Sequence, residues 1–202
     1  MTFSAPDNSQ FTLRYRDEAE MILSGIDCVL NGEKAVYCST ELTTGTRLYG
    51  ALREHKCKNT ADLRATMGEA WFKNTIVDAN ARSANQFARQ VRALLRGTEL
   101  VVTPAPFAAP GWSQPQYLAF WETFLRTRVK CVWFEKDWQF SNGCVLEFAT
   151  AHDVKLPALD HSGNALGLGQ ATQLIESAIQ QLKNDGFDAA ELSREFAALR
   201  QS

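Results

Sequence analysis

The sequence has no excess of charge of either sign. Its 202 residues include 21 Lys and Arg against 23 Asp and Glu, which gives a formal net charge of −2. A protein that is held to a nucleic acid or to an anionic lipid surface mainly by charge needs an excess of positive side chains. We therefore expect neither a nucleic acid nor a membrane as a partner.

Long apolar runs are also missing. No stretch approaches the roughly 20 residues that span a bilayer, and the first residues, 1–7, lack the basic and apolar regions of a secretory signal. The five cysteines form no Cys-x-x-Cys pair and mostly lie inside apolar runs, as Cys131 does, which is typical of reduced, buried thiols. These features predict a soluble cytoplasmic protein.

Several motifs that would indicate a particular chemistry are absent. The chain has no Gly-x-Gly-x-x-Gly, no phosphate-binding P-loop and no Gly-x-Ser-x-Gly element. His55, Cys57, His152 and His161 do not show the paired spacing of zinc ligands. We therefore expect no metal site and no cofactor.

What is present is the composition of an ordinary folded domain, with 45% hydrophobic and 22% charged residues. Apolar residues recur at helical spacing in residues 17–30, 61–71, 75–96, 114–127, 141–152, 168–183 and 188–200. Short apolar runs that suit strands occupy residues 34–39, 99–103, 129–134 and 154–159. This alternation predicts an α/β fold, a Rossmann-like three-layer sandwich whose central sheet is mostly parallel and has about five strands.

We divide the chain into a helical extension (residues 1–32), one α/β domain (33–185) and a C-terminal helix (186–202). Ligands of parallel sheets bind at the carboxyl ends of the strands. The segments predicted to lie there are residues 40–45, 104–113, 135–143 and 160–169.

The segment that runs from a predicted strand-end loop into a helix carries the clearest pattern. Ser141 suits the N-cap position of that helix. Gly143, Glu147 and Ala151 then follow at a spacing of four residues and share one helix face, on which the carboxylate leans back over the glycine. This arrangement suits the floor of a pocket. The residue types alone leave an alternative open, in which Ser141 only caps the helix and Glu147 is an exposed or arginine-paired side chain.

The pattern Ser-x-Gly-x-x-x-Glu-x-Ala-x-Ala, preceded by Trp138, resembles the segment that marks the nucleoside 2-deoxyribosyltransferase-like superfamily, which includes nucleotide N-glycosidases. Residues 36–39 are similar to the first strand of that family, and residues 85–104 to its next helix and strand. The resemblance implies that residues 33–185 are a domain of this type and that Glu147 is a nucleophile on the anomeric carbon of a nucleoside or nucleoside 5′-monophosphate. It also implies a homo-oligomer, a dimer or larger, for which residues 188–200 are a candidate interface.

Further roles are expected from position. Substrate-binding residues are predicted in the loop after the first strand (Ser39, Thr40, Glu41) and at the start of the later helix (Trp138, Ser141, Asn142, Gly143). A 5′-phosphate would bind at that helix N-terminus, where free N–H groups favour anions. The departing base needs a proton or a hydrogen bond, and we assign this role to Asp137 or Asp160 on loop position alone. The alternative is that these aspartates only cap turns and helices.

The chain departs from the family at two places. Thr40-Glu41 stands where the family usually has Gly-Pro, and Arg128-Val129-Lys130 stands where an aspartate is common. These departures favour one alternative, a nucleotide sensor that has kept the pocket and lost the chemistry. Two others are an NAD-type glycohydrolase and an accessory protein that acts through a partner bound at the aromatic loop 107–112.

Overall fold

The computed structural model describes residues 8–200, and the side chains of residues 14–197 and 199–200. Its sheet has the strand order β2-β1-β3-β4, and every neighbouring pair is parallel. The strands are β1 (Ala35–Ser39), β2 (Val101–Val102), β3 (Val129–Phe134) and β4 (Ala158–Leu159). The predicted α/β class with a parallel sheet is confirmed.

The predicted count of about five strands is wrong, because the described residues form four. Both edge strands are also shorter than their apolar runs. Pro104 has no N–H and follows β2 closely, while Val154 still belongs to the end of the preceding helix, so only Ala158 and Leu159 pair with β3. The two central strands therefore carry most of the sheet.

The helices of the described chain are α1 (Asn8–Leu30), α2 (Thr46–Glu54), α3 (Thr60–Met67), α4 (Glu69–Phe72), α5 (Asp78–Leu94), α6 (Gln114–Arg128), α7 (Asn142–Asp153), α8 (Leu168–Asn184) and α9 (Ala190–Leu199). A π-helical turn, η1 (Lys73–Val77), joins α4 to α5, and a 3-10 turn, η2 (Trp138–Phe140), precedes α7. The sequence analysis did not predict α2, and it placed the start of α1 at residue 17.

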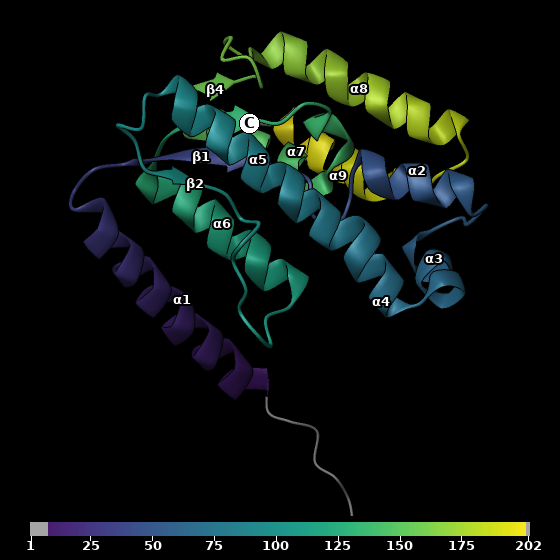
Figure 1. Ribbon diagram of the computed structural model, residues 1–202, viewed down its shortest axis with the longest axis horizontal. Helices are drawn as coiled ribbons and strands as arrows, with labels where there is room; N and C mark the ends of the chain where they lie inside the picture. The colour runs from purple at the N-terminus through teal and green to yellow at the C-terminus, as the bar shows by residue number, and fades with distance from the viewer. Residues whose placement is uncertain (1–7, 201–202) are drawn as a thin grey trace, which may run out of the picture.

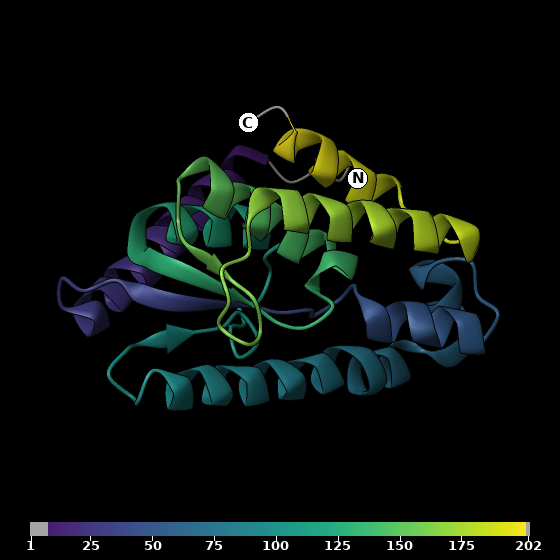
Figure 2. The same cartoon turned by 90° about the horizontal axis from the view of Figure 1, so that it is seen from above.

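Helices cover both faces of the sheet (Figures 1 and 2). Side chains alternate along β1, so that Val36 and Cys38 pack with Phe87 of α5, whereas Ala35 and Tyr37 belong to the core on the other side, with α6 and α7. After β1 the chain passes through α2, α3 and α4 before it reaches α5 on one face, whereas β3 is followed by α7 on the other face. Since β1 and β3 are neighbours, a crevice opens at their carboxyl ends.

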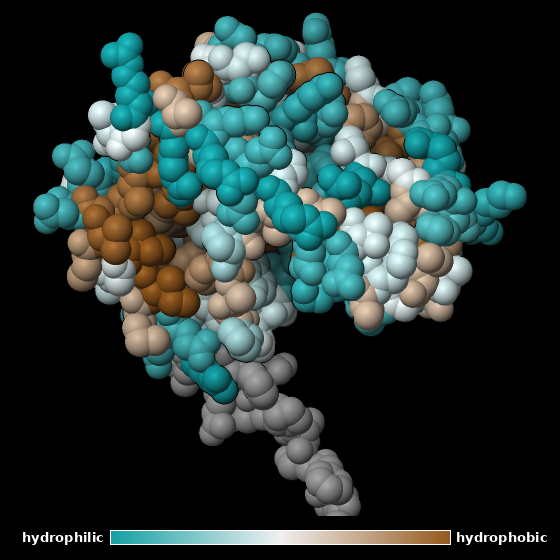
Figure 3. Space-filling model, viewed as in Figure 1, coloured by the Kyte–Doolittle hydropathy of each residue, from teal (hydrophilic) through white to brown (hydrophobic). Residues whose placement is uncertain are grey.

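The two terminal helices pack on the α6 and α7 side of the molecule. α1 lies along α6 (Figure 1), where the Arg128 guanidinium donates two hydrogen bonds of 2.7 Å to the Asp27 carboxylate. α9 packs against α7. No helix within residues 8–200 has an apolar stretch long enough to cross a bilayer. Figure 3 shows apolar surface gathered on the side where β1 begins, opposite the carboxyl ends of the strands.

Candidate active site

A buried carboxylate, that of Glu147, lies at the carboxyl end of β1. Glu147 belongs to the second turn of α7 and is 8% exposed. Its two oxygens accept hydrogen bonds from two different hydroxyls: Tyr37 Oη donates to Oε1 at 2.6 Å, and Ser39 Oγ donates to Oε2 at 2.5 Å. The carboxylate is therefore held in one orientation, since hydrogen bonds to a charged group are the strong ones.

The local sequence explains why these two hydroxyls meet the same carboxylate. Tyr37 and Ser39 are two residues apart on β1, so their side chains point to the same face of the sheet. That face is covered by α7, which starts after the neighbouring strand β3. The alternation of the strand and the register of β1 with β3 thus place both donors beneath Glu147.

Burial dominates the acidity of this group and raises the pKa of Glu147 to about 7, while the hydroxyls of Ser39 and Tyr37 act in the opposite direction. Burial and the neighbouring carboxylate also raise the pKa of the Tyr37 hydroxyl, which therefore remains a donor. A carboxyl group with a pKa near 7 can be ionised or protonated at neutral pH. It can therefore act as a nucleophile or exchange a proton.

Glu147 borders a cavity of about 530 Å³, the size of a small-molecule site. Polar residues come from the loop after β1, the start of α7, α3, α6 and α9, and apolar ones from the loop after β1, α4, η1, α5 and the 104–121 region. The lining residues are Thr40, Leu42, Thr43, Thr44, Thr60, Arg64, Phe72, Val77, Ala81, Pro104, Ala105, Phe107, Gln114, Tyr117, Leu118, Trp121, Ser141, Asn142, Gly143, Glu147 and Glu191.

One wall of this cavity is aromatic and firmly packed. Phe107 stacks on Phe120 with ring centroids 4.9 Å apart and planes 7° apart, and it meets Trp121 edge-on at 5.2 Å. The Tyr117 hydroxyl accepts from the N–H of Ala109 at 2.8 Å and donates to its carbonyl at 3.0 Å. These contacts fix the loop against α6 and give the cavity flat faces on which a planar ring can stack.

The packing of the aromatic loop 107–112 bears on one alternative from the sequence, an accessory protein whose partner binds at this loop. That alternative requires the aromatic side chains of the loop to be exposed. Phe107 is only partly exposed and faces the cavity, and Trp112 packs edge-on against Tyr15 at 4.9 Å. The indole N–H of Trp112 donates to Glu18 of α1 at 2.9 Å. Both rings are thus engaged within the chain, and the structure offers no observation in favour of that alternative.

Five of the predicted site residues line the cavity together: Thr40, Ser141, Asn142, Gly143 and Glu147. The sequence suggested that the Ser141 side chain caps α7, but it forms no capping hydrogen bond in the structure. Its Oγ lies 3.2 Å from the Thr44 Oγ1 instead, and that threonine accepts a hydrogen bond from the Asn142 N–H. Ser39, predicted to bind substrate, holds Glu147.

Glu41 and Trp138 lie elsewhere. The Glu41 carboxylate is 7% exposed and accepts from the N–H of Thr46, 3.0 Å from each oxygen, at the start of α2. Trp138 is 4% exposed and stacks on Phe148, with centroids 5.2 Å apart. Neither is among the described residues that line the cavity, so Glu41 stabilises a helix terminus and Trp138 belongs to the core.

The two aspartates proposed as proton donors are also not among the described residues that border the cavity. Asp160 accepts from the N–H groups of Ser162 and Asn164, at 2.8 and 2.9 Å, and thereby closes its own turn. Burial raises the pKa of Asp160, but the hydrogen bonds from Asn164 and Ser162 and the nearby His161 together outweigh it, so the pKa is lowered. Asp137 adopts a left-handed conformation just before η2. The geometry lends no support to a proton-donor role for either.

Several residues of the site were not singled out from the sequence, among them Tyr37, Trp121, Glu191 and Thr44, although Thr44 lies in the predicted strand-end segment 40–45. Tyr37 could have been found, because its spacing from Ser39 places both hydroxyls on one strand face. Trp121 and Thr44 reach the cavity through the packing of α6 and of the loop before α2. Glu191 comes from α9, more than 40 residues after Glu147, and no local pattern points to it.

Arg128 and Lys130, which stand where the resemblance implies an aspartate, lie around the start of β3, at the other end of that strand from the cavity. Arg128 pairs with Asp27, and Lys130 forms an ion pair with Glu99 beside β2. These two cations are therefore engaged in surface contacts that do not involve the residues around Glu147.

Within residues 8–200, no group of three or more His, Cys, Asp or Glu side chains is arranged to hold a metal ion. Comparison with family models, with curated proteins and with solved structures found no match to this chain. The function has to be argued from the cavity itself.

Proposed function

We propose that this protein cleaves the N-glycosidic bond of a nucleoside or nucleoside 5′-monophosphate, with Glu147 as the nucleophile. The observation that carries the proposal is the buried Glu147 carboxylate, which borders the cavity while a hydroxyl from β1 holds each of its oxygens. The resemblance of residues 141–151 to the nucleoside 2-deoxyribosyltransferase-like superfamily supports the same assignment from the sequence.

The proposed chemistry uses the carboxylate at the anomeric carbon. A Glu147 oxygen forms a bond to that carbon as the carbon–nitrogen bond breaks, and the electron pair of the broken bond passes to the base. This step has an oxocarbenium-like transition state that a fixed carboxylate stabilises. Water or a second base then attacks the same carbon, releases the Glu147 carboxylate, and gives hydrolysis or transfer respectively.

The remaining walls suit the other parts of such a substrate. Phe107, Tyr117 and Trp121 provide flat faces for the base. Gln114 and Arg64 also line the cavity and carry N–H donors that can form hydrogen bonds with a departing base, which lowers the barrier to its release. The hydroxyls of Thr44 and Ser141, near the start of α7, can contact the sugar.

Base release from a panel of substrates tests the proposal. Ribo- and deoxyribonucleosides, their 5′-monophosphates and NAD are incubated with the wild-type protein and with Glu147→Gln, and released bases are separated by chromatography. We expect release from one nucleoside class that the variant lacks, together with a glycosyl adduct on the peptide that contains Glu147, detected by mass spectrometry after rapid quenching.

Other outcomes would identify the alternatives. Release of nicotinamide alone would identify an NAD-type glycohydrolase. Thermal stabilisation by a nucleotide without any turnover would identify a sensor, an alternative that the two sequence departures favour. Equal base release by wild type and Glu147→Gln would overturn the assignment of the nucleophile.

A further inference from the structure

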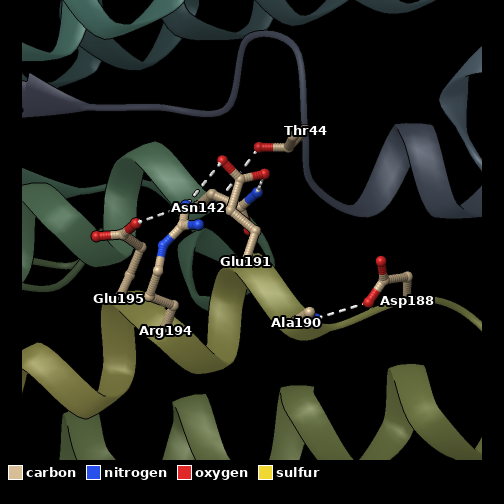
Figure 4. Close-up of polar contacts among 7 residues, drawn as sticks. All are labelled: Thr44, Asn142, Asp188, Ala190, Glu191, Arg194 and Glu195. Atoms are coloured by element: carbon tan, nitrogen blue, oxygen red, sulfur yellow. Dashed lines mark hydrogen bonds and ion pairs between the residues drawn. The ribbon is translucent and has the colours of Figure 1, made fainter.

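The end of the cavity at the start of α7 is built from three chain segments (Figure 4). Asn142 of α7, Thr44 of the loop before α2 and Glu191 of the first turn of α9 meet there. The Asn142 Nδ2 donates to Glu191 Oε2 at 2.6 Å, and the Asn142 N–H donates to Thr44 Oγ1 at 3.3 Å. A carboxylate of the chain itself thus lies at the helix N-terminus where an anionic group of a ligand would otherwise bind.

Two groups at this end accept hydrogen bonds and cannot donate them: the Glu191 carboxylate and the Asn142 Oδ1. One N–H of the Asn142 side-chain amide is donated to the Glu191 carboxylate. The Asn142 Oδ1 is buried and has no hydrogen-bond partner among the described residues. An unsatisfied buried acceptor is costly, so a ligand group that donates a hydrogen bond would be favoured here. A sugar hydroxyl has such a donor, whereas a phosphate dianion has none.

The charges around this end also oppose an anion. Burial, followed by the carboxylates of Glu191, Asp188 and Glu41, raises the pKa of the nearby Tyr49 to about 12. The nearest cation to Glu191, Arg194, is 70% exposed, does not border the cavity, and divides its contacts between Glu191 at 3.6 Å and Glu195 at 3.4 Å (Figure 4).

Two other cations, Lys58 and Arg64, border the same region, but neither forms an ion pair with Glu191. Lys58 is exposed and borders a smaller cavity that shares Thr44, Asn142 and Glu191 with the main one. Arg64 borders the main cavity but stacks over Phe72 at 4.2 Å and pairs with Glu69. Among the described residues, Arg194 is the one cation that forms an ion pair with Glu191.

We propose that Glu191 is a specificity-determining residue that selects substrates with an uncharged hydroxyl at this end, so that the protein acts on nucleosides in preference to nucleoside 5′-monophosphates. The inference rests on the proposed function and narrows its substrate class. Asn142 lies five residues before Glu147, about 7.5 Å along the axis of α7. That separation is comparable to one sugar unit, so the anomeric carbon can lie at Glu147 while the 5′-hydroxyl reaches Asn142 and Glu191.

The test compares matched pairs of nucleosides and their 5′-monophosphates as substrates. We expect the wild-type protein to have the higher kcat/KM for the nucleoside of the pair. Glu191→Gln keeps the size of the side chain and an acceptor for Asn142 but removes the charge. It should shift the ratio of kcat/KM values toward the monophosphate by about tenfold or more, because close like charges oppose binding strongly. Glu191→Ala should shift the ratio in the same direction.

The control is Glu195→Gln, one turn further along α9, which also contacts Arg194 but does not border the cavity. It should leave the ratio unchanged. A wild-type preference for monophosphates, or a ratio that Glu191→Gln does not move, would overturn the inference while leaving the nucleophile role of Glu147 intact.

Binding separates this inference from the proposed function. Glu147→Gln, which should not turn over, is titrated with the same pairs and followed by its melting temperature. Stabilisation by the nucleoside and not by the monophosphate supports the inference independently of catalysis. If no compound of either class binds or is cleaved, the proposed function fails and the inference fails with it.

Discussion

Two buried glutamates lie near the carboxyl end of β1. Glu41 follows that strand in the chain and Glu147 of α7 is hydrogen-bonded to it, but the surroundings of the two carboxylates differ. Glu41 and Glu147 are 7% and 8% exposed, and burial raises the pKa of each to about 7. Glu41 is closed off: both oxygens accept from the N–H of Thr46, and a Cβ at Gly45 would lie 2.1 Å from its carboxyl carbon.

Glu147 differs in what surrounds it. Its donors are the side-chain hydroxyls of Tyr37 and Ser39, and it borders the cavity. A raised pKa therefore follows mainly from burial in this molecule and does not by itself identify a catalytic carboxylate. Access to a cavity and the kind of donor distinguish a carboxylate available for chemistry from one that stabilises the end of a helix.

The largest expected difference between the two glutamates is in catalysis. Glu147→Gln should lower kcat for base release by at least about a thousandfold, because the covalent step loses its nucleophile. Glu41→Gln should retain activity to within about tenfold, since only the start of α2 is affected. Steady-state kinetics on the best substrate of the panel measures both, with melting temperatures as the check on folding. Equal losses of kcat in Glu147→Gln and Glu41→Gln would show that the two glutamates do not differ in their catalytic role.

A smaller effect is expected from the donors to Glu147. Tyr37→Phe and Ser39→Ala each remove one hydroxyl that favours the ionised carboxylate, so the pKa of Glu147 should rise. Because the nucleophile must be ionised, activity should increase with pH through about 7 in the wild type. The rising limb should move to higher pH by about one unit in each variant, as expected for a hydrogen bond to a charged group.

The pH profile of kcat/KM measures this shift. Thr46→Ser, which keeps the hydroxyl near Glu41, is the matched control and should leave the profile in place. A limb that stays at the same pH in both Tyr37→Phe and Ser39→Ala would mean that another group controls the ionisation.

The sequence predicted one half of this site and missed the other for a physical reason. Ser141, Gly143 and Glu147 follow from helical periodicity after a strand, and Thr40 follows from the strand-end rule. The same rule also selected Asp160, because it identifies the correct edge of the sheet but not which loops turn toward the crevice. Glu191 depends on how α9 packs on α7, which is a tertiary contact without a local pattern.

The fold shows the same division. The parallel α/β sheet was predictable from the alternation of helices and strands, whereas the number of paired residues in an edge strand was not. Runs 99–103 and 154–159 have strand-like composition over their whole length, yet only two residues of each pair with a neighbour. The extent of an edge strand depends on its partner and on the adjoining loops.

In stability the two glutamates should behave alike. Each has a folded-state pKa raised above its ordinary value of 4.5, so each destabilises the fold increasingly as the pH rises from about 4.5 to above 7. Relative to the wild type, Glu147→Gln and Glu41→Gln should therefore gain stability between pH 5 and pH 8. The gain should be up to about 3 kcal/mol each, from the size of the shift. Urea unfolding at the two pH values measures the difference. Relative stabilities that fall with pH would contradict the assigned direction of the shifts.

The smallest effect is expected at Asp160, the carboxylate that the sequence placed in the site and the structure places in a turn. Asp160→Asn retains an oxygen that can accept from the N–H groups of Ser162 and Asn164, so the melting temperature should fall only slightly, by the equivalent of about 1 kcal/mol or less. Base release should stay within about twofold of the wild type, because Asp160 does not border the cavity within this chain. Loss of activity in a variant that remains folded would place Asp160 in a site completed by a second copy of the chain. The acidic groups that matter for catalysis would then come from two subunits, and Glu147 and Glu41 of one chain would not be enough to describe the site.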